Sequence, residues 1–83
     1  MQTPVLTKGI YRHYKGNQYQ VIDLVQHSET QEWLVLYKAL YGDYSSWVRP
    51  FTMFTESVVT ENGAVPRFAL TLALEYLWYD PCH

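Results

Sequence analysis

The chain has 83 residues, enough for one domain, and we expect a single domain over residues 1–83. Apolar residues make up 48% and charged residues only 17%, which excludes a disordered, highly charged chain. Six basic against eight acidic residues give a net charge of −2, so there is no strong positive field, and one cysteine excludes an intrachain disulfide or a cysteine-built zinc site.

Three short strands separated by turn residues are predicted in the first half of the chain. Aromatic and β-branched residues fill 9–14, 18–27 and 32–39. Residues 15–18 place Gly before Asn, which suits a tight hairpin turn, and the polar residues 28–31 form the next connection. The third of these strands is apolar on both faces, so we expect it to be the middle of the sheet.

A short strand and a tight turn are expected next. The strand covers residues 47–49 and is stopped by Pro50, which cannot donate a ladder hydrogen bond. The following residues 51–54 are too few for a helix of their own. We expect them to make one turn that plugs the end of a barrel with Met53 or Phe54.

A second hairpin is predicted around an Asn-Gly pair. Residues 56–60 and 64–68 are apolar runs on either side of residues 61–63, which read Glu-Asn-Gly. Asn-Gly between two such runs is a strong hairpin signal. Pro66 then places the last strand at an edge or an end of the sheet.

These elements together predict an all-β, mainly antiparallel fold. Parallel strands need crossovers of about a dozen residues or more, and the connections here are too short for them. We expect a small SH3-like barrel of about five strands, with residues 9–68 as its core, because closure removes exposed strand edges. An open sheet of about five strands capped by the tail is the competing layout.

The apolar tail is ambiguous between two structures. Its Ala, Leu and Glu residues favour a helix, with a stripe formed by Leu70, Leu74 and Leu77, yet its apolar residues also alternate at the strand period. We expect residues 69–80 to form a short C-terminal helix, with an extra strand as the alternative. Such a helix would be apolar nearly all round, which predicts a homodimer or partner contact. The interface candidates are Leu72, Tyr76 and Trp78.

The sequence contains no signal for a membrane span or for secretion. The longest apolar stretch, residues 68–79, is interrupted by Thr71 and Glu75, whereas a span needs about 20 residues. Residues 1–4 lack a basic region followed by an apolar core. We therefore expect a cytoplasmic protein that does not bind membranes.

Catalytic and metal-binding patterns do not stand out. His27, Ser28 and Glu29 are consecutive, so in an extended segment they point to opposite faces and cannot form a triad. His13 and His27 with Glu29 or Asp23 are a weak metal set, because the hairpin register separates the two histidines by more than about 20 Å along the strand. The four glycines are isolated, so no phosphate loop is present. We expect no catalytic residue, no metal and no cofactor.

Aromatic and basic residues form the combination that points to binding. The planar, permanently charged guanidinium of Arg49 close to Trp47 suits an anionic or π-bearing ligand. The alternative is that most of the aromatic rings fill the core while an arginine pairs with Glu56 or Glu29. The candidates for a ligand-binding surface are Tyr11, Arg12, His13, Tyr37, Trp47 and Arg49.

Several of these residues belong to a recognisable pattern. Its segments are Gly9–Gly16, Tyr19-x-Val-Ile, His27–Thr30, Leu34-Val35-x-Tyr37, Leu40–Gly42, Trp47–Pro50, Met53-Phe54 and Pro66–Phe68. Over about residues 8–68 the chain resembles the bacterial domain-of-unknown-function family 1653. The resemblance implies a compact β domain, standalone or fused, and supplies no catalytic residue. The tail beyond Phe68 lies outside the pattern.

The resulting functional prediction is a non-catalytic binding or interaction module. Its ligand would be a protein, a peptide or a small anion that contacts the aromatic and basic surface. One alternative is a single-stranded nucleic-acid binder that uses Lys8, Arg12 and Lys15 with Arg49, although the net charge counts against it. The other alternative is a small enzyme or enzyme accessory domain that uses His13, as general base, and Arg49.

Overall fold

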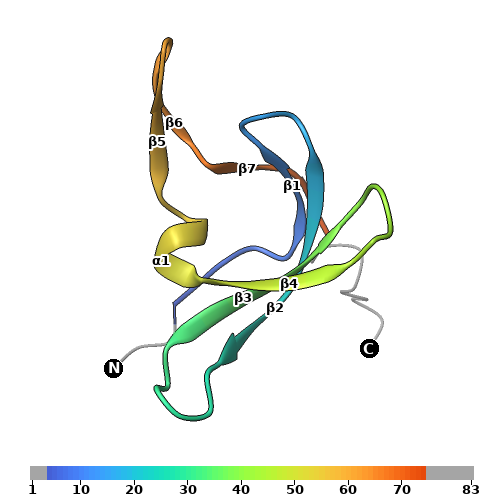
Figure 1. The fold of residues 1–83 in the computed structure, drawn as a ribbon, viewed down its shortest axis with the longest axis vertical. Coiled ribbons are helices and arrows are strands. Elements are labelled where there is room, and N and C mark those ends of the chain that lie inside the picture. The colour runs from blue at the N-terminus through green and yellow to red at the C-terminus, as the bar shows by residue number, and fades with distance from the viewer. Residues whose placement is uncertain (1–3, 75–83) are drawn as a thin grey trace, which may run out of the picture.

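A computed structural model describes residues 4–74 of the chain, and Figure 1 shows its elements. One short helix and a set of short strands, all paired antiparallel, make up this part of the protein. The elements in chain order are β1 (Gly9–His13), β2 (Gln18–Gln26), β3 (Trp33–Ala39), β4 (Ser46–Pro50), α1 (Phe51–Phe54), β5 (Ser57–Thr60), β6 (Gly63–Pro66) and β7 (Phe68–Ala73). The predicted all-β, antiparallel class is confirmed.

The main sheet has five strands in the order β4-β3-β2-β1-β7, and β5 and β6 form a separate hairpin. Strands β4 and β7 lie at opposite edges and do not pair with each other, so the sheet formed by residues 4–74 is open. The SH3-like barrel is therefore not confirmed. The segment that joins these two edge strands contains α1 and the β5–β6 hairpin, which leaves the sheet in Figure 1. The strand that was expected to be central, β3, lies second from an edge. The middle strand is β2, because β7 adds to the sheet beside β1.

The first part of the predicted C-terminal helix is a strand. Residues 68–73 form β7, which pairs antiparallel with β1, and the Leu74 N–H donates to the Lys8 carbonyl at 3.0 Å. Tertiary pairing wins over the helical propensity of Ala and Leu because it satisfies the backbone groups along the free edge of β1. Leu72 is 49% exposed on β7. The remainder of the predicted helix, residues 75–80, lies outside the described residues, as do Tyr76 and Trp78.

The core lies on the inner face of the curved sheet. Strand alternation places every second residue on this face, as the pattern of buried residues Val35, Tyr37 and Ala39 on β3 shows. Helix α1 covers the face with Phe54, which is 1% exposed, whereas the adjacent Met53 is 45% exposed. The expectation that residues 51–54 are too few for a helix is wrong, and Phe54, not Met53, covers the core of an open sheet instead of plugging a barrel. The buried cluster consists of Tyr11, Val21, Val35, Tyr37, Phe54 and Phe68.

The β5–β6 hairpin projects from the sheet in Figure 1, and its position confirms the hairpin predicted around Asn62-Gly63. Val59 near its tip is 88% exposed. The base of the hairpin is closed by Glu56 and Arg67, since the Arg67 N–H donates to the Glu56 carbonyl at 3.0 Å. The hairpin thus brings the side chain of Arg67 next to the sheet.

Membrane insertion by a helix finds no support in residues 4–74, where no helix has the length and apolar character that a membrane crossing requires. The cytoplasmic location stays a prediction.

Candidate functional site

The candidate site has an aromatic floor centred on Phe68, the first residue of β7. The Phe68 ring stacks on Phe54 with 4.1 Å between centroids and packs edge-on against His13 at 5.0 Å and Tyr37 at 5.8 Å. Because β1 pairs His13 with Phe68 and β3 delivers Tyr37, the floor joins strands from both halves of the sheet. Its geometry is therefore fixed by the core.

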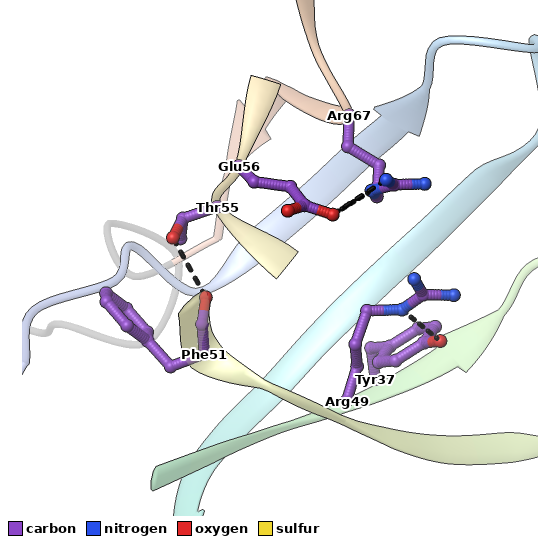
Figure 2. A network of polar contacts seen from close by, with 6 residues as sticks. All are labelled: Tyr37, Arg49, Phe51, Thr55, Glu56 and Arg67. Atoms are coloured by element: carbon purple, nitrogen blue, oxygen red, sulfur yellow. Dashed lines mark hydrogen bonds and ion pairs between the residues drawn. The ribbon is translucent and has the colours of Figure 1, made fainter. Parts of the chain in front are cut away.

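The guanidinium group of Arg49 lies on this floor. Its carbon Cζ sits 5.7 Å from the centre of the Phe68 ring, and its Nε–H donates to the Tyr37 hydroxyl oxygen at 3.4 Å (Figure 2). The residue is half-buried, and among residues 4–74 no carboxylate lies within ion-pair distance of it. A partly desolvated charge without a counter-ion is unfavourable, so this position favours a bound anion.

A second guanidinium group, that of Arg67, extends into the same region. Figure 2 shows Arg67 and Arg49 on the same side of the sheet, with the Glu56 carboxylate at Arg67. Arg67 donates from Nη2 at 2.7 Å and from Nε at 3.1 Å, both to Oε1 of Glu56. This ion pair anchors Arg67, whose positive charge acts on the nearby His13.

His13 completes the group, and we refer to His13, Arg49 and Arg67 as the basic cluster. Burial lowers the pKa of His13, and the positive charges of Arg67, Arg49 and Lys15 lower it further. The backbone N–H of Lys15 donates to His13 Nδ1 at 3.2 Å, so the neutral ring carries its proton on Nε2. His13 therefore offers a neutral N–H donor near two guanidinium groups, and an anion nearby would favour its protonation.

Two tyrosine hydroxyls lie beside the aromatic floor. Those of Tyr19 and Tyr41 are 2.7 Å apart, and the Tyr19 ring packs edge-on against Tyr37 at 5.5 Å and Phe68 at 5.6 Å. Burial and the hydrogen bond between the Tyr19 and Tyr41 hydroxyls raise the pKa of Tyr19 to about 12. Tyr19 thus stays neutral at physiological pH and adds no negative charge to the region.

The predicted binding residues separate into four environments, one of which Trp47 occupies alone. Tyr11 and Tyr37 are buried, at 5% and 6% exposure, so they act as supports of the surface. His13 and Arg49 belong to the basic cluster. Arg12 is exposed and follows Tyr11 in β1, so it points to the opposite face of the sheet.

Trp47 occupies a separate position on the inner face. It pairs with Tyr37 in the β3–β4 register, is 57% exposed, and donates from Nε1 to Ser45 Oγ at 2.9 Å. The ring over which Arg49 lies is Phe68 and not the Trp47 indole. The structure thus places Trp47 on the same face as Arg49 and at the open side of the sheet, where β4 is the edge strand.

Sequence reasoning did not identify Arg67 or Phe68 as site residues. The signal for Arg67 was present, because extending the predicted hairpin outward from Asn62-Gly63 sets Glu56 opposite Arg67. The signal for Phe68 was absent, since its place beside His13 depends on the pairing of β7 with β1, which joins distant parts of the chain.

Two further features lie outside this cluster. Within residues 4–74, no three His, Cys, Asp or Glu side chains come together to hold a metal ion. A groove of about 400 Å³ has an aromatic wall formed by Trp33 and Phe51, and Pro4 contributes to its lining. No member of the basic cluster lines this groove.

Comparison with known proteins gives one family and one solved structure. The family described as "Protein of unknown function (DUF1653)" matches residues 9–70. The chain is also similar to the crystal structure of a protein of that family from Bordetella bronchiseptica, with 37% sequence identity and a TM-score of 0.75. That similarity covers 80% of this chain and 87% of the other. No curated protein matches the chain.

Proposed function

The chain belongs to the DUF1653 family, whose function is unknown, and we propose that it is a non-catalytic binding module in which Arg49 holds an anionic group of the ligand. One observation carries this proposal. The half-buried guanidinium of Arg49 lies on Phe68 and Tyr37 without a carboxylate partner among residues 4–74. His13 and Arg67 act with it.

The arrangement suits a carboxylate or a phosphate. A guanidinium group presents parallel N–H donors in a plane, and these match two oxygens of either anion. Packing against Phe68 and Tyr37 restricts the Arg49 side chain before the ligand arrives, so less conformational entropy is lost on binding. An anion at Arg49 would also offset the repulsion between Arg49 and the protonated form of His13.

The nucleic-acid and enzyme alternatives have weaker support. A single-stranded nucleic acid would stack its bases on exposed rings, and Trp47 offers one such ring. A general-base role for His13 agrees with its lowered pKa. Among residues 4–74, however, the groups that surround His13 are cations and aromatic rings, an arrangement that favours the binding of an anion.

The test is an amide chemical-shift titration with sulfate and, separately, with acetate, at constant ionic strength. We expect shifts around His13, Arg49 and Arg67 for both anions. Arg49→Gln should weaken sulfate binding by about tenfold or more, since a lost charged hydrogen bond is worth about 1.5–3 kcal/mol.

Arg12→Gln is the matched control, because it removes the same charge from the opposite face of β1. It should leave the affinity for sulfate unchanged within about twofold. Equal affinities for the unchanged chain and folded Arg49→Gln would overturn the proposal, as would a loss of equal size in Arg12→Gln. Binding of an oligothymidylate that Trp47→Ala abolishes and Arg49→Gln preserves would favour the nucleic-acid alternative.

A further inference from the structure

The open edge of the sheet at β4 lies next to the basic cluster. Within residues 4–74, β4 pairs with β3 alone, so its other side has no strand partner. The Ala39 N–H donates to the Ser45 carbonyl at 2.9 Å, which identifies Ala39–Ser45 as a hydrogen-bonded pair. Antiparallel pairs alternate, so Trp47 and Arg49 bond toward β3, while the N–H and C=O of Val48 point out to the open edge.

The residues of this edge lack the usual protection against strand addition. Trp47 is 57% exposed and Val48 is 55% exposed, and neither is charged. Sheet edges are commonly protected by charged side chains, proline or bulges. Here the only proline, Pro50, ends the strand, and the charged residue, Arg49, is held on the inner face by Tyr37 and Phe68.

We propose that the partner of this domain is an extended peptide segment that adds to the edge of β4 and places an acidic side chain beside Arg49. The inference rests on the proposed anion-binding function and names its partner class. The outward backbone groups of Val48 would exchange two hydrogen bonds with the central residue of the peptide, as in other strand-addition complexes.

The register then fixes the side-chain pattern of the peptide. Residues on either side of the central one lie opposite Trp47 and Arg49, on the inner face, in the closer type of antiparallel pair. Charge complementarity selects Asp or Glu opposite Arg49, which has no carboxylate partner among residues 4–74. The exposed indole selects an aromatic or apolar side chain opposite Trp47. The predicted pattern is an acidic residue and an apolar residue separated by one position.

The experiment uses a terminally blocked pentapeptide of sequence Thr-Glu-Val-Tyr-Thr, titrated into the full chain with amide chemical shifts as the readout. We expect shifts along β4 and at His13. A peptide with glutamate and valine exchanged has the same composition but places the acidic residue next to the tyrosine, so it has the wrong spacing and should bind about tenfold more weakly. Replacing glutamate by glutamine in the peptide should have an effect of similar size.

Two changes test the backbone pairing itself. Val48→Pro removes a backbone N–H donor that the β3–β4 ladder does not use, so it should leave the affinity for sulfate unchanged. The affinity for the peptide should fall by about tenfold or more. N-methylation of the central valine of the peptide removes the matching donor without altering the protein, and it should have the same effect even if Val48→Pro fails to fold.

The outcomes separate the two proposals. If sulfate binds at Arg49 but the N-methylated and exchanged peptides bind as well as the original, the strand-addition proposal is wrong and the anion site remains. If the original peptide gives no shifts at all, the strand-addition proposal is equally wrong. If Arg49→Gln leaves sulfate binding unchanged, the anion site itself is wrong.

Discussion

Phe54→Ala is expected to lower the free energy of unfolding by about 3–5 kcal/mol, as is typical for a buried phenylalanine. Phe54 is 1% exposed, stacks on Phe68 at 4.1 Å, and meets Tyr11 edge-on at 5.6 Å. Truncation would leave a cavity under α1 that the sheet cannot fill without moving these rings. Urea denaturation followed by tryptophan fluorescence measures the change.

Met53→Ala is the matched control for that measurement. It removes a side chain from the same short helix, but Met53 is 45% exposed. We therefore expect the free energy of unfolding to fall by less than about 1 kcal/mol. Equal losses for the two variants would show that α1 does not close the core through Phe54.

Gly9→Ala is expected to destabilise the protein by about 3 kcal/mol, at the upper end of the range for overpacking. A Cβ atom at Gly9 would collide with the Leu72 carbonyl oxygen and crowd Ala73 Cα at 3.0 Å. Both are backbone atoms of β7, so the clash is relieved only if β7 moves away from β1. We expect faster hydrogen exchange at the Leu74 amide, which donates to the Lys8 carbonyl.

Gly42→Ala provides the comparison for Gly9→Ala. Gly42 has φ of +62° in the β3–β4 turn, and no atom lies within 4 Å of the place that an added Cβ would occupy. Only backbone strain of about 1 kcal/mol is therefore expected. If Gly9→Ala were no more destabilising than Gly42→Ala, the close approach of β7 to β1 would be contradicted. The same result would question the position of Phe68 beneath Arg49, because β7 carries Phe68.

Local sequence signals predicted most of the strands. Alternating apolar residues and the turns at Gly16, Gly42 and Asn62-Gly63 depend on neighbours in the chain, and each appears where the structure has a hairpin. Residues 69–73 were expected in a helix because nothing in their own composition reveals the free edge of β1. The same lack of long-range information led to the expectation of a closed barrel.

The sequence predicted some residues of the candidate site but not the contacts between them. His13 and Arg49 were selected because basic residues stood beside aromatic ones, and the structure brings both to Phe68. Spacing alone suggested Trp47 as the partner of Arg49, since the two residues share a strand face. Contact with Phe68 instead depends on how the sheet curves, which no local pattern encodes.

The central claim is that an anion binds within the basic cluster, and the pKa of His13 tests it most directly. Burial and the charges of Arg67 and Arg49 lower this pKa in the free protein, so the imidazole is neutral at physiological pH. A bound anion favours the protonated ring. By linkage, the pKa rises when the anion binds, and the affinity for the anion rises as the pH falls through that pKa.

The measurement is a proton NMR titration of the His13 ring with and without sulfate, whose charge does not change over the range in which histidine titrates. Chloride at equal ionic strength is the control for general screening, and the exposed ring of His27, at the far end of β2, is the internal reference. We predict that sulfate raises the pKa of His13 more than chloride does, and that Arg49→Gln removes most of this difference. A His13 pKa that responds identically to sulfate and chloride would contradict the account.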